Sequence, residues 1–308
     1  MKRIIKNQQV VLKELNEFGI SLYVKREDQI HPFISGNKYR KLKYNILQAE
    51  RENKKTLLTF GGAYSNHISA VAFAGKEYGF ETIGIIRGDE LSANFEEVRK
   101  QNTTLSFAYK NGMKFKFISR SDYRKKHTSD FINELNREFG EFYLIPEGGT
   151  NDLAIKGCEE ILKQDDNEFD LICCAVGTGG TIAGLINSAK KDQRVLGFPA
   201  LKGDFLTKEI KKYAIPGENW SLNTDYNFGG FGKINLDLIN FINRFFQETN
   251  IPLDPIYTGK MMYGIVDLIK NNFFKKGTKI LAIHTGGLQG VDGMNSYLKR
   301  KELPLIIT

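Results

Sequence analysis

The chain has 308 residues, of which 41% are hydrophobic and 26% are charged, and its formal net charge is +8. This length allows one large domain or two lobes with full hydrophobic cores, and the composition is that of an ordinary globular protein. The positive charge is spread over scattered lysines without the basic, aromatic-interleaved patch of a nucleic-acid-binding protein, so no nucleic-acid partner is expected.

Membrane and metal-dependent classes are disfavoured as well. No apolar run reaches the roughly 18 residues of a membrane span, and the first seven residues hold no sustained apolar stretch of a signal peptide. A cytoplasmic protein without a membrane partner is therefore expected. Three cysteines, two of them adjacent at Cys173 and Cys174, form neither a disulfide framework nor a metal-ligand set. Four histidines without paired spacing argue against a zinc site, so no metal is expected.

Short apolar runs alternate with helical patterns along the chain. An extended run over 22–28 is followed by a helical pattern that opens within 35–42. Strands are then expected at 56–60, 82–87, 114–118, 142–145, 171–176, 195–198 and 279–283. Helices are expected at 66–78, 92–109, 129–139, 152–163, 181–190, 236–248 and 260–271. This alternation predicts an α/β fold with mainly parallel sheets flanked by helices.

The order of these elements predicts two domains. Residues 52–150 hold four expected strands and three expected helices, and we assign them to a smaller α/β domain. Residues 1–51 together with 151–308 form the expected larger domain. No Gly/Ser linker, repeat or low-complexity tract marks the boundary, which is therefore inferred from topology alone.

The first candidate site residue is Lys38, at the start of the helical pattern. Gly36 allows a tight turn, and Ser35 or Asn37 is expected to cap the helix with a side-chain oxygen. The positive end of the helix dipole disfavours a cation at this place, and a neutral amine can attack a carbonyl to form a Schiff base. The alternative is a solvated lysine, the usual state of the 44 Lys and Arg residues in this chain.

The next candidates follow the strand expected at 56–60. Gly61 and Gly62 form a turn, after which Ser65, Asn66 and His67 open a helix. Ligands bind beyond the carboxyl ends of parallel strands, so these side chains and the free N–H groups behind them suit a carboxylate or a phenolate oxygen. The alternative is that Ser65 simply caps the helix.

A second glycine-rich turn follows the strand expected at 171–176, and it comprises Gly177, Thr178, Gly179, Gly180 and Thr181. Its backbone N–H groups and the following helix dipole predict an anion site. The spacing is not G-x-G-x-x-G, no acidic residue ends the next expected strand, and the P-loop lysine is missing. One compact phosphate therefore fits better than a dinucleotide, and a purely structural turn remains the alternative.

Two further stretches lie near the C-terminus. The prolines of 252–260 fix an extended segment that enters a helix, from whose start Tyr257 and Thr258 would point between the domains. Packing of a half-buried Tyr257 is the alternative. The stretch from His284 through Thr285 to two glycines is another strand-to-glycine turn, where His284 is most simply a structural histidine.

Together, these motifs resemble the family of pyridoxal-phosphate enzymes that comprises 1-aminocyclopropane-1-carboxylate deaminase and D-cysteine desulfhydrase. The resemblance runs from Lys25-Arg26-Glu27-Asp28 to His284-Thr285-Gly286-Gly287. The ordered set Ser-Gly-Asn-Lys, Gly-Gly-x-x-Ser-Asn-His, Gly-Thr-Gly-Gly-Thr and Asp-Pro-x-Tyr-Thr-Gly-Lys is highly specific. It implies the two-domain fold of the tryptophan synthase β type (fold type II), with pyridoxal 5'-phosphate between the domains. It also implies a small amino-acid substrate and a homodimer.

The resemblance implies a role toward the cofactor for four sets of residues. Lys38 would form the Schiff base and move the substrate proton. Asn66 would bond the ring oxygen of the cofactor, and the loop from Gly177 to Thr181 would bind its phosphate. Thr258 would face the pyridine nitrogen.

Other residues would face the substrate. Ser65 and His67 would hold its carboxylate beside Asn66, and Tyr257 would be an acid/base or an anchor over it. Lys38, Tyr257 and Ser65 are the expected catalytic residues. The expected substrate-binding set is Ser65, Asn66, His67, Phe231, Tyr257 and Thr285.

Three positions bear on the reaction. Family deaminases carry Glu at the position of Thr258 and Leu at that of Thr285, whereas D-cysteine desulfhydrases carry small hydroxyl residues there. A glutamate keeps the pyridine nitrogen protonated, which opening a cyclopropane needs, while a neutral ring suffices to eliminate a thiolate. The expected reaction is therefore α,β-elimination from D-cysteine to pyruvate, ammonia and sulfide. Phe231 stands where the family commonly has an active-site Tyr, which removes a hydroxyl and leaves the substrate open.

The alternatives are 1-aminocyclopropane-1-carboxylate deaminase and another D-amino-acid lyase or racemase of this fold. A catalytically silent ligand-binding protein that keeps the fold and the cofactor belongs to a different class. An NAD-dependent oxidoreductase is disfavoured by the missing acidic residue.

Overall fold

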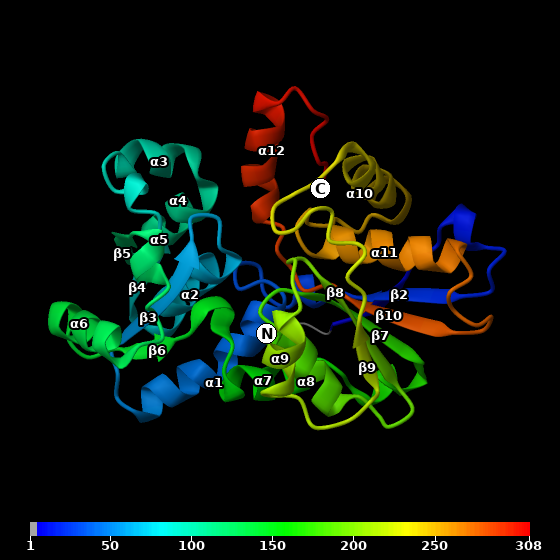
Figure 1. The fold of residues 1–308 in the computed structure, drawn as a ribbon, viewed down its shortest axis with the longest axis horizontal. Helices are drawn as coiled ribbons and strands as arrows, with labels where there is room; N and C mark the ends of the chain where they lie inside the picture. Colours follow the sequence, from blue (N-terminus) through cyan, green and yellow to red (C-terminus); the bar gives the residue numbers. More distant parts are fainter. Residues whose placement is uncertain (1–4) are drawn as a thin grey trace.

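The computed structural model describes residues 5–308 and contains two mainly parallel β-sheets (Figure 1). The larger sheet has six strands in the order β1-β2-β10-β7-β8-β9. In that order they are Asn7–Gln9, Ser21–Lys25, Lys279–Ile283, Leu171–Val176, Arg194–Pro199 and Trp220–Leu222. Only β1 runs antiparallel to its neighbour within this sheet. The wholly buried β7, at its centre, explains why the sequence there is apolar without alternation.

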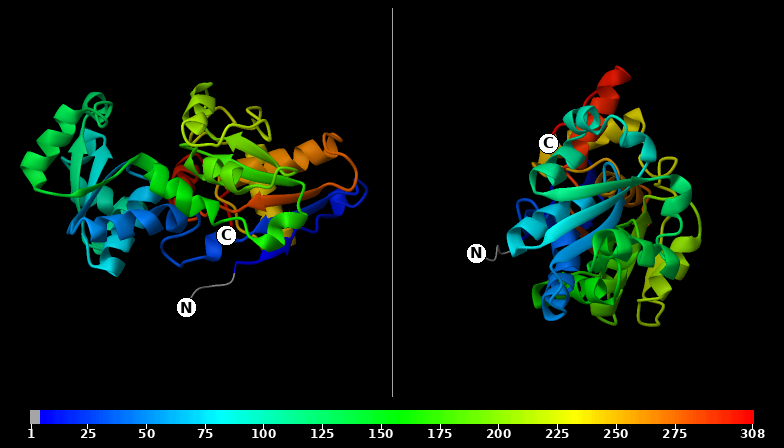
Figure 2. Two further views of the ribbon diagram at one scale, coloured as in Figure 1. Left: turned by 90° about the horizontal axis from the view of Figure 1, so that it is seen from below. Right: turned by 90° about the vertical axis from the view of Figure 1, so that its left-hand side faces the viewer.

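The smaller sheet has four parallel strands in the order β5-β4-β3-β6. In that order they are Met113–Ile118, Glu81–Arg87, Thr56–Gly62 and Tyr143–Ile145. Every one of these strands lies within 52–150, while the six-stranded sheet takes its strands from 1–51 and 151–308. Figure 2 shows the smaller sheet with its helices at one end of the long axis of the molecule.

Helices cover both sheets. They are α1 (Asn37–Arg51), α2 (Asn66–Tyr78), α3 (Phe95–Gln101), α4 (Thr103–Lys110), α5 (Arg120–Tyr123), α6 (Ser129–Phe139), α7 (Asp152–Glu159), α8 (Gly180–Ser188), α9 (Phe205–Lys211), α10 (Leu236–Thr249), α11 (Thr258–Lys270) and α12 (Gly290–Arg300). In Figure 1, α10 and α11 lie on one face of the six-stranded sheet, and α8 lies on the other. The buried side chains of α10 and α11 share one core with β2 and β10, and those of α8 share a second core with β7 and β8.

Helix α1 connects the two sheets. Its buried face, with Leu42 and Ile46, belongs to the same core as Leu57 of β3, so the segment 1–51 does not pack solely with the larger sheet. Its opposite side lies against α7, where a Cβ added at Gly157 would lie 1.9 Å from the carbonyl oxygen of Arg40. The boundary between the two expected domains stays a prediction.

The predicted strands and helices are present, with ends shifted by a few residues, and one of them divides. The helix expected at 92–109 is split between α3 and α4 because Asn102 adopts an extended conformation, and its side chain accepts a hydrogen bond from the N–H of Leu105 at 2.9 Å. Asparagine is a preferred N-cap residue, so it starts a new helix here. The short elements β1, β9, α5 and α9, and the C-terminal α12, were not predicted.

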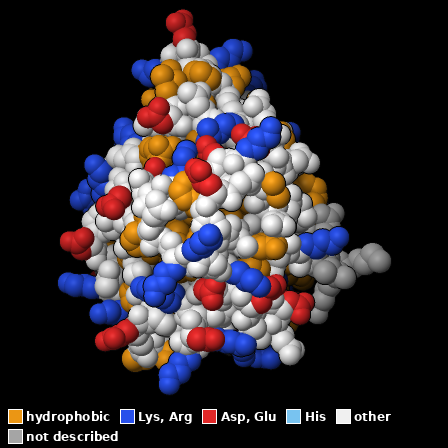
Figure 3. All heavy atoms as spheres, turned by 90° about the vertical axis from the view of Figure 1, so that its right-hand side faces the viewer, with side chains coloured by type: hydrophobic (Ala, Val, Ile, Leu, Met, Phe, Trp, Pro, Cys, Tyr) orange, Lys and Arg blue, Asp and Glu red, His pale blue; other side chains and the backbone are white. Residues whose placement is uncertain are grey.

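Some features of the described chain bear on possible partners. Within residues 5–308, no helix is long and apolar enough to cross a membrane. His, Cys, Asp and Glu side chains of this part also form no group of three that could hold a metal ion. On the face in Figure 3, basic and acidic side chains are interspersed. Residues 1–4, which open the segment assessed for a signal peptide, lie outside the described residues.

Candidate functional site

The start of helix α1 is fixed by the turn that follows strand β10. Gly36 has φ +60°, and a Cβ there would lie 2.0 Å from the carbonyl oxygen of Thr285, so only glycine fits. That same oxygen accepts a hydrogen bond from the N–H of Asn37 at 3.2 Å. Lys38 therefore occupies the first turn of a helix whose start is held by another segment of the chain.

The expected side-chain cap of α1 is wrong. Gly36 precedes the helix, and no side chain caps it. The Ser35 hydroxyl instead donates to the carbonyl oxygen of Asp28 at 3.3 Å, and the Asn37 amide donates to Thr181 Oγ1 at 2.8 Å. Both side chains thus dock α1 onto neighbouring segments, and Asn37 binds the first turn of α8.

Two lysines of α1 reach one carbonyl group. Lys38 Nζ donates to the oxygen of Gly148 at 3.3 Å, and Lys41 Nζ donates to the same oxygen at 3.0 Å and to Thr150 Oγ1 at 3.0 Å. Their spacing of three residues puts both on one side of the helix. Burial and the positive charge of Lys41 lower the pKa of Lys38 to about 7. A large fraction of the Lys38 amine is therefore neutral, and nucleophilic, near neutral pH.

Lys41 also faces the turn between β7 and α8. Its Nζ lies 3.5 Å from Thr178 Oγ1, and a Cβ added at Gly180 would lie 3.1 Å from it. Lys41 is only 2% exposed and forms no ion pair with a described carboxylate. Lys41 thus places a buried, unpaired cation beside the glycine-rich turn and the N-terminus of α8. This charge should bind an anion more tightly than the turn could alone.

The turn after β3 brings three predicted residues to the start of α2. The Ser65 hydroxyl accepts a hydrogen bond from the N–H of Ile68 at 3.4 Å, so the capping alternative is confirmed. Capping leaves the hydroxyl proton and the first N–H groups of α2 available to a ligand. The Asn66 amide oxygen is buried and has no hydrogen-bond partner within the described chain, which is uncommon in a folded protein.

His67 is almost fully buried behind this turn. Its Nε2 lies 2.8 Å from Thr59 Oγ1, while its Nδ1 has no partner among the described residues. Burial, together with the charges of Lys38 and Lys41, lowers the pKa of His67 well below its usual value. His67 is therefore neutral at physiological pH and lies close enough to both lysines to feel their charge.

Tyr257 lies against the glycine-rich turn from its other side. A Cβ added at Gly177 would lie 3.1 Å from the Tyr257 ring. Burial and the charges of Asp254 and Glu147 raise the pKa of Tyr257, so its phenol stays protonated. The ring of Phe231 meets that of Tyr257 edge to face, with 6.1 Å between the ring centres, and Phe231 is 52% exposed.

Thr258 is fully buried, and its hydroxyl is held by Asp254. The hydroxyl donates to Asp254 Oδ1 at 2.7 Å and accepts the N–H of Asp254 at 2.9 Å. The Asp254 carboxylate also accepts the backbone N–H groups of residues 256, 257 and 258, at 2.9, 2.9 and 2.8 Å. The proton of Thr258 is thus not free for another acceptor.

The turn after β10 joins these parts. His284 has the structural role given as its simplest interpretation, since Nδ1 accepts the N–H of Gly286 at 3.2 Å while Nε2 lies 2.6 Å from the carbonyl oxygen of Pro252. A Cβ added at Gly287 would lie 3.1 Å from Asn66 Nδ2 and 3.2 Å from Asp254 Cγ. The turn after β10 therefore touches the start of α1, the start of α2 and the segment before α11.

Comparison with known proteins shows which family this chain resembles. The model of the family "Pyridoxal-phosphate dependent enzyme" matches residues 4–286. A relative from Pyrococcus horikoshii, named provisionally as a 1-aminocyclopropane-1-carboxylate deaminase, is 33% identical over 89% of this chain and 86% of its own length.

The chain belongs to the pyridoxal-phosphate-dependent enzymes. The bifunctional D-cysteine desulfhydrase/1-aminocyclopropane-1-carboxylate deaminase of Arabidopsis thaliana, a mitochondrial protein, is 29% identical to this enzyme over 91% of the chain and 76% of its own length. The crystal structure of an "ACC deaminase homologue" superposes with a TM-score of 0.82 at 29% identity, and covers 97% of this chain and 94% of that one. The predicted family, cofactor and type II fold are confirmed.

The residues around Lys38 and Lys41 fit pyridoxal phosphate. The enzyme offers an amine of lowered pKa at Lys38, a buried cation at Lys41, and a glycine-rich turn that Lys41 reaches. The buried Asn66 oxygen without a partner is a further polar group that a ligand would satisfy. The structure thus brings together Lys38, residues 65–67, the turn 177–181 and Tyr257.

Sequence reasoning missed three parts of the site in this enzyme. Lys41 was overlooked, although its i+3 spacing from Lys38 was a usable signal. The segment 147–150 was also overlooked, although it follows β6 with two glycines and a threonine, the pattern that singled out the other turns. The role of Asp254 as the partner of Thr258 had no sequence signal beyond its place in a motif.

Proposed function

We propose that this enzyme catalyses α,β-elimination from D-cysteine, giving pyruvate, ammonia and sulfide. The observation that carries the proposal is the state of Thr258, which the family resemblance sets opposite the pyridine nitrogen. Thr258 offers a neutral hydroxyl, and the nearby Asp254 carboxylate is already bonded by three N–H groups and that hydroxyl. A site without a free carboxylate favours an unprotonated pyridine ring.

The cofactor site would be built from two lysines and one turn. Lys41 and the N–H groups of 177–181 would hold the phosphate, because charge and helix dipole act there together. Lys38, with its pKa lowered to about 7, would hold the aldehyde carbon and carry the substrate Cα proton. When bound, pyridoxal phosphate supplies the electron sink that stabilises negative charge on the substrate Cα.

The substrate side would be formed by α2 and Tyr257. Ser65 and the first N–H groups of α2 would bind the substrate carboxylate at the positive end of the helix dipole. Because its pKa is raised, Tyr257 keeps its proton and would donate it rather than accept one. Thr285, whose carbonyl oxygen holds the start of α1, is the second small hydroxyl residue that supports the desulfhydrase reaction.

The second candidate is 1-aminocyclopropane-1-carboxylate deamination to 2-oxobutyrate and ammonia. It is favoured by the provisional name of the Pyrococcus horikoshii relative and by the bifunctional Arabidopsis thaliana enzyme. Opening a cyclopropane needs a stronger electron sink than elimination of a thiolate, so the Thr258 environment weighs against it.

A product assay on the cofactor-loaded protein separates these reactions. D-cysteine, L-cysteine and 1-aminocyclopropane-1-carboxylate are offered separately, and sulfide, pyruvate and 2-oxobutyrate are measured, with Lys38→Ala as the inactive control. We expect sulfide and pyruvate from D-cysteine alone. Formation of 2-oxobutyrate from the cyclopropane would contradict the argument from Thr258, and the absence of product from D-cysteine would refute the proposed substrate.

We also propose a homodimer and a cytoplasmic location, as the resemblance and the sequence imply.

A further inference from the structure

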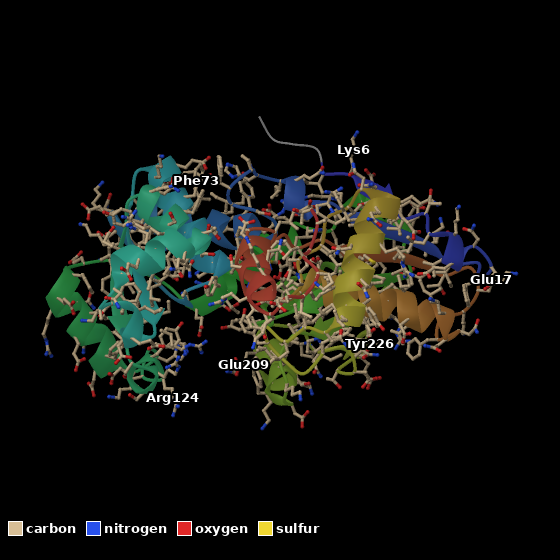
Figure 4. All side chains as sticks on the ribbon, turned by 90° about the horizontal axis from the view of Figure 1, so that it is seen from above. Lys6, Glu17, Phe73, Arg124, Glu209 and Tyr226 are labelled. Atoms are coloured by element: carbon tan, nitrogen blue, oxygen red, sulfur yellow. The ribbon has the colours of Figure 1, made fainter. Side chains whose placement is uncertain are left out.

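A loop of residues 226–232 lies along helix α11. At the far end of the contact, the Tyr226 hydroxyl donates to Asp267 Oδ2 at 2.8 Å, and Figure 4 shows Tyr226 beside α10 and α11. Nearer the helix start, the ring of Phe228 meets that of Tyr263 edge to face, with 5.0 Å between ring centres. The loop therefore contacts α11 at more than one point along its length.

Lys260, nearer the start of α11, makes a further contact with this loop. Its Nζ donates to the carbonyl oxygens of Asn227 and Gly230, both at 2.8 Å, and the residue is only 2% exposed. It forms no ion pair with a described residue. Burying an ammonium without an ionic partner is costly, so the two carbonyl contacts must matter to the folded state.

The loop needs such an anchor. Gly229 and Gly230 have φ of +94° and +114°, and Gly232 has φ +70°, so the segment is rich in residues of high conformational freedom. Phe231 sits among them with 52% of its surface exposed. One edge-to-face ring contact is weak, so the Tyr257 ring alone would not hold Phe231 in place.

We propose that Lys260 is a positioning residue that holds loop 226–232 so that Phe231 covers Tyr257, and that this ring pair is the apolar wall for the substrate side chain. The substrate part of this inference rests on the proposed function. Lys260 follows Tyr257 by three residues, so one face of the first turns of α11 carries both the wall and its anchor. This apolar wall should affect the binding of the substrate and not the chemical step, because Phe231 has no group that can transfer a proton.

The first test follows the position of Phe231 without using activity. Phe231→Trp is made together with Trp220→Phe, because Trp220 is the one tryptophan of the chain. We expect high fluorescence anisotropy of the new indole, and lower anisotropy with faster acrylamide quenching when Lys260→Met is added. Lys270→Met, a more exposed lysine on the same helix, is the matched control and should change neither. A mobile indole in the protein with Lys260 intact would overturn the proposal, even if Lys260→Met does not fold.

The second test is kinetic. In Lys260→Met and in Phe231→Ala, KM for D-cysteine should rise about tenfold, the equivalent of about 1.4 kcal/mol of binding free energy. Because both changes would remove the same wall, the double variant should have no higher KM than either single variant, and kcat should stay within about threefold. Additive effects, or a loss confined to kcat, would overturn the proposal. If D-cysteine is not a substrate, the proposed function fails while the indole measurement still decides the role of Lys260.

Discussion

Lys38 and Lys41 direct their amines at one acceptor, the carbonyl oxygen of Gly148, at 3.3 and 3.0 Å. Like charges one turn apart on a helix repel each other, and here both are desolvated. Burial lowers the pKa of Lys41 as well, and Lys38 is lowered to about 7. The pair thus keeps one amine neutral while the other faces the anion site.

Removing Lys41 should raise the pKa of Lys38. In cofactor-free Lys41→Met, the neighbouring positive charge is gone, so the neutral fraction of Lys38 at pH 7 should fall. The pKa of Lys38 is measured by labelling the protein with acetic anhydride at a series of pH values and quantifying the acetylated Lys38 peptide by mass spectrometry. Acetic anhydride carries no phosphate, so its reaction does not depend on the anion site that Lys41 faces. Lys43→Met is the control, since Lys43 pairs with Glu160 on another side of α1. An unchanged or lowered midpoint in Lys41→Met would contradict the coupling.

The stability of the cofactor-free protein should depend on pH through Lys38. The unfolded chain keeps the ordinary pKa of 10.5, while the folded value is about 7, so between these values the unfolded state binds the proton and the folded state does not. The free energy of unfolding therefore rises with pH between about 7 and 10.5. Below about pH 7 Lys38 is protonated in both states, and the folded state bears the full cost of burying its charge. Urea unfolding at several pH values should show this rise in the unchanged protein and a smaller one in Lys38→Met. Parallel curves would refute the lowered pKa.

Gly36→Ala should abolish cofactor binding. The Cβ would strike the Thr285 carbonyl oxygen, and φ +60° with ψ −136° is a conformation that alanine rarely adopts. The start of α1, and Lys38 with it, must shift. Gly79→Ala is the control, because Gly79 also has positive φ but a Cβ there meets nothing within 4 Å. That change should cost about 1–2 kcal/mol of stability and leave the visible absorption of the bound cofactor intact.

Glu27→Gln should destabilise the fold. Glu27 is fully buried, and its carboxylate accepts two parallel hydrogen bonds from Arg40, each of 2.9 Å. Removing one partner of a buried ion pair costs up to about 3 kcal/mol, and Arg40, which also lies 3.7 Å from Glu160, keeps the loss at or below that figure. Urea midpoints measure the loss. Glu90→Gln removes the partner of Arg120 in an exposed pair and should leave the midpoint unchanged. Equal midpoints for both variants would show that the Glu27–Arg40 pair is not stabilising.

The pattern of apolar residues predicted secondary structure well where the strands are fully buried. The apolar runs of β7 and β10 have no competing interpretation, and strand-to-glycine turns marked the residues that the structure brings together at 65–67 and 177–181. Single side chains decided the failures. Asn102 divides a helix that hydrophobic spacing predicts as continuous, and Ser35 and Asn37 bind other segments although their type suits a cap.

Burial of charge was the part that the sequence did not reveal. Lys41, Lys43 and Lys260 are the same residue type, yet the first and last are buried and the middle one pairs at the surface. Whether a lysine is buried depends on segments distant in sequence, such as 147–150 for Lys41 and 227–230 for Lys260. Local pattern carries no information on that pairing.

The close approach of α1 and α7 at Gly157 limits which substitutions this chain can accept at that position. Arg40, whose carbonyl oxygen would lie 1.9 Å from a Cβ at 157, is only two residues beyond Lys38. A methyl group at 157 would push the helix backbone outward and carry the Lys38 amine away from Gly148. Gly157 makes no contact with the Lys38 amine, yet its lack of a side chain is needed to keep that amine in place.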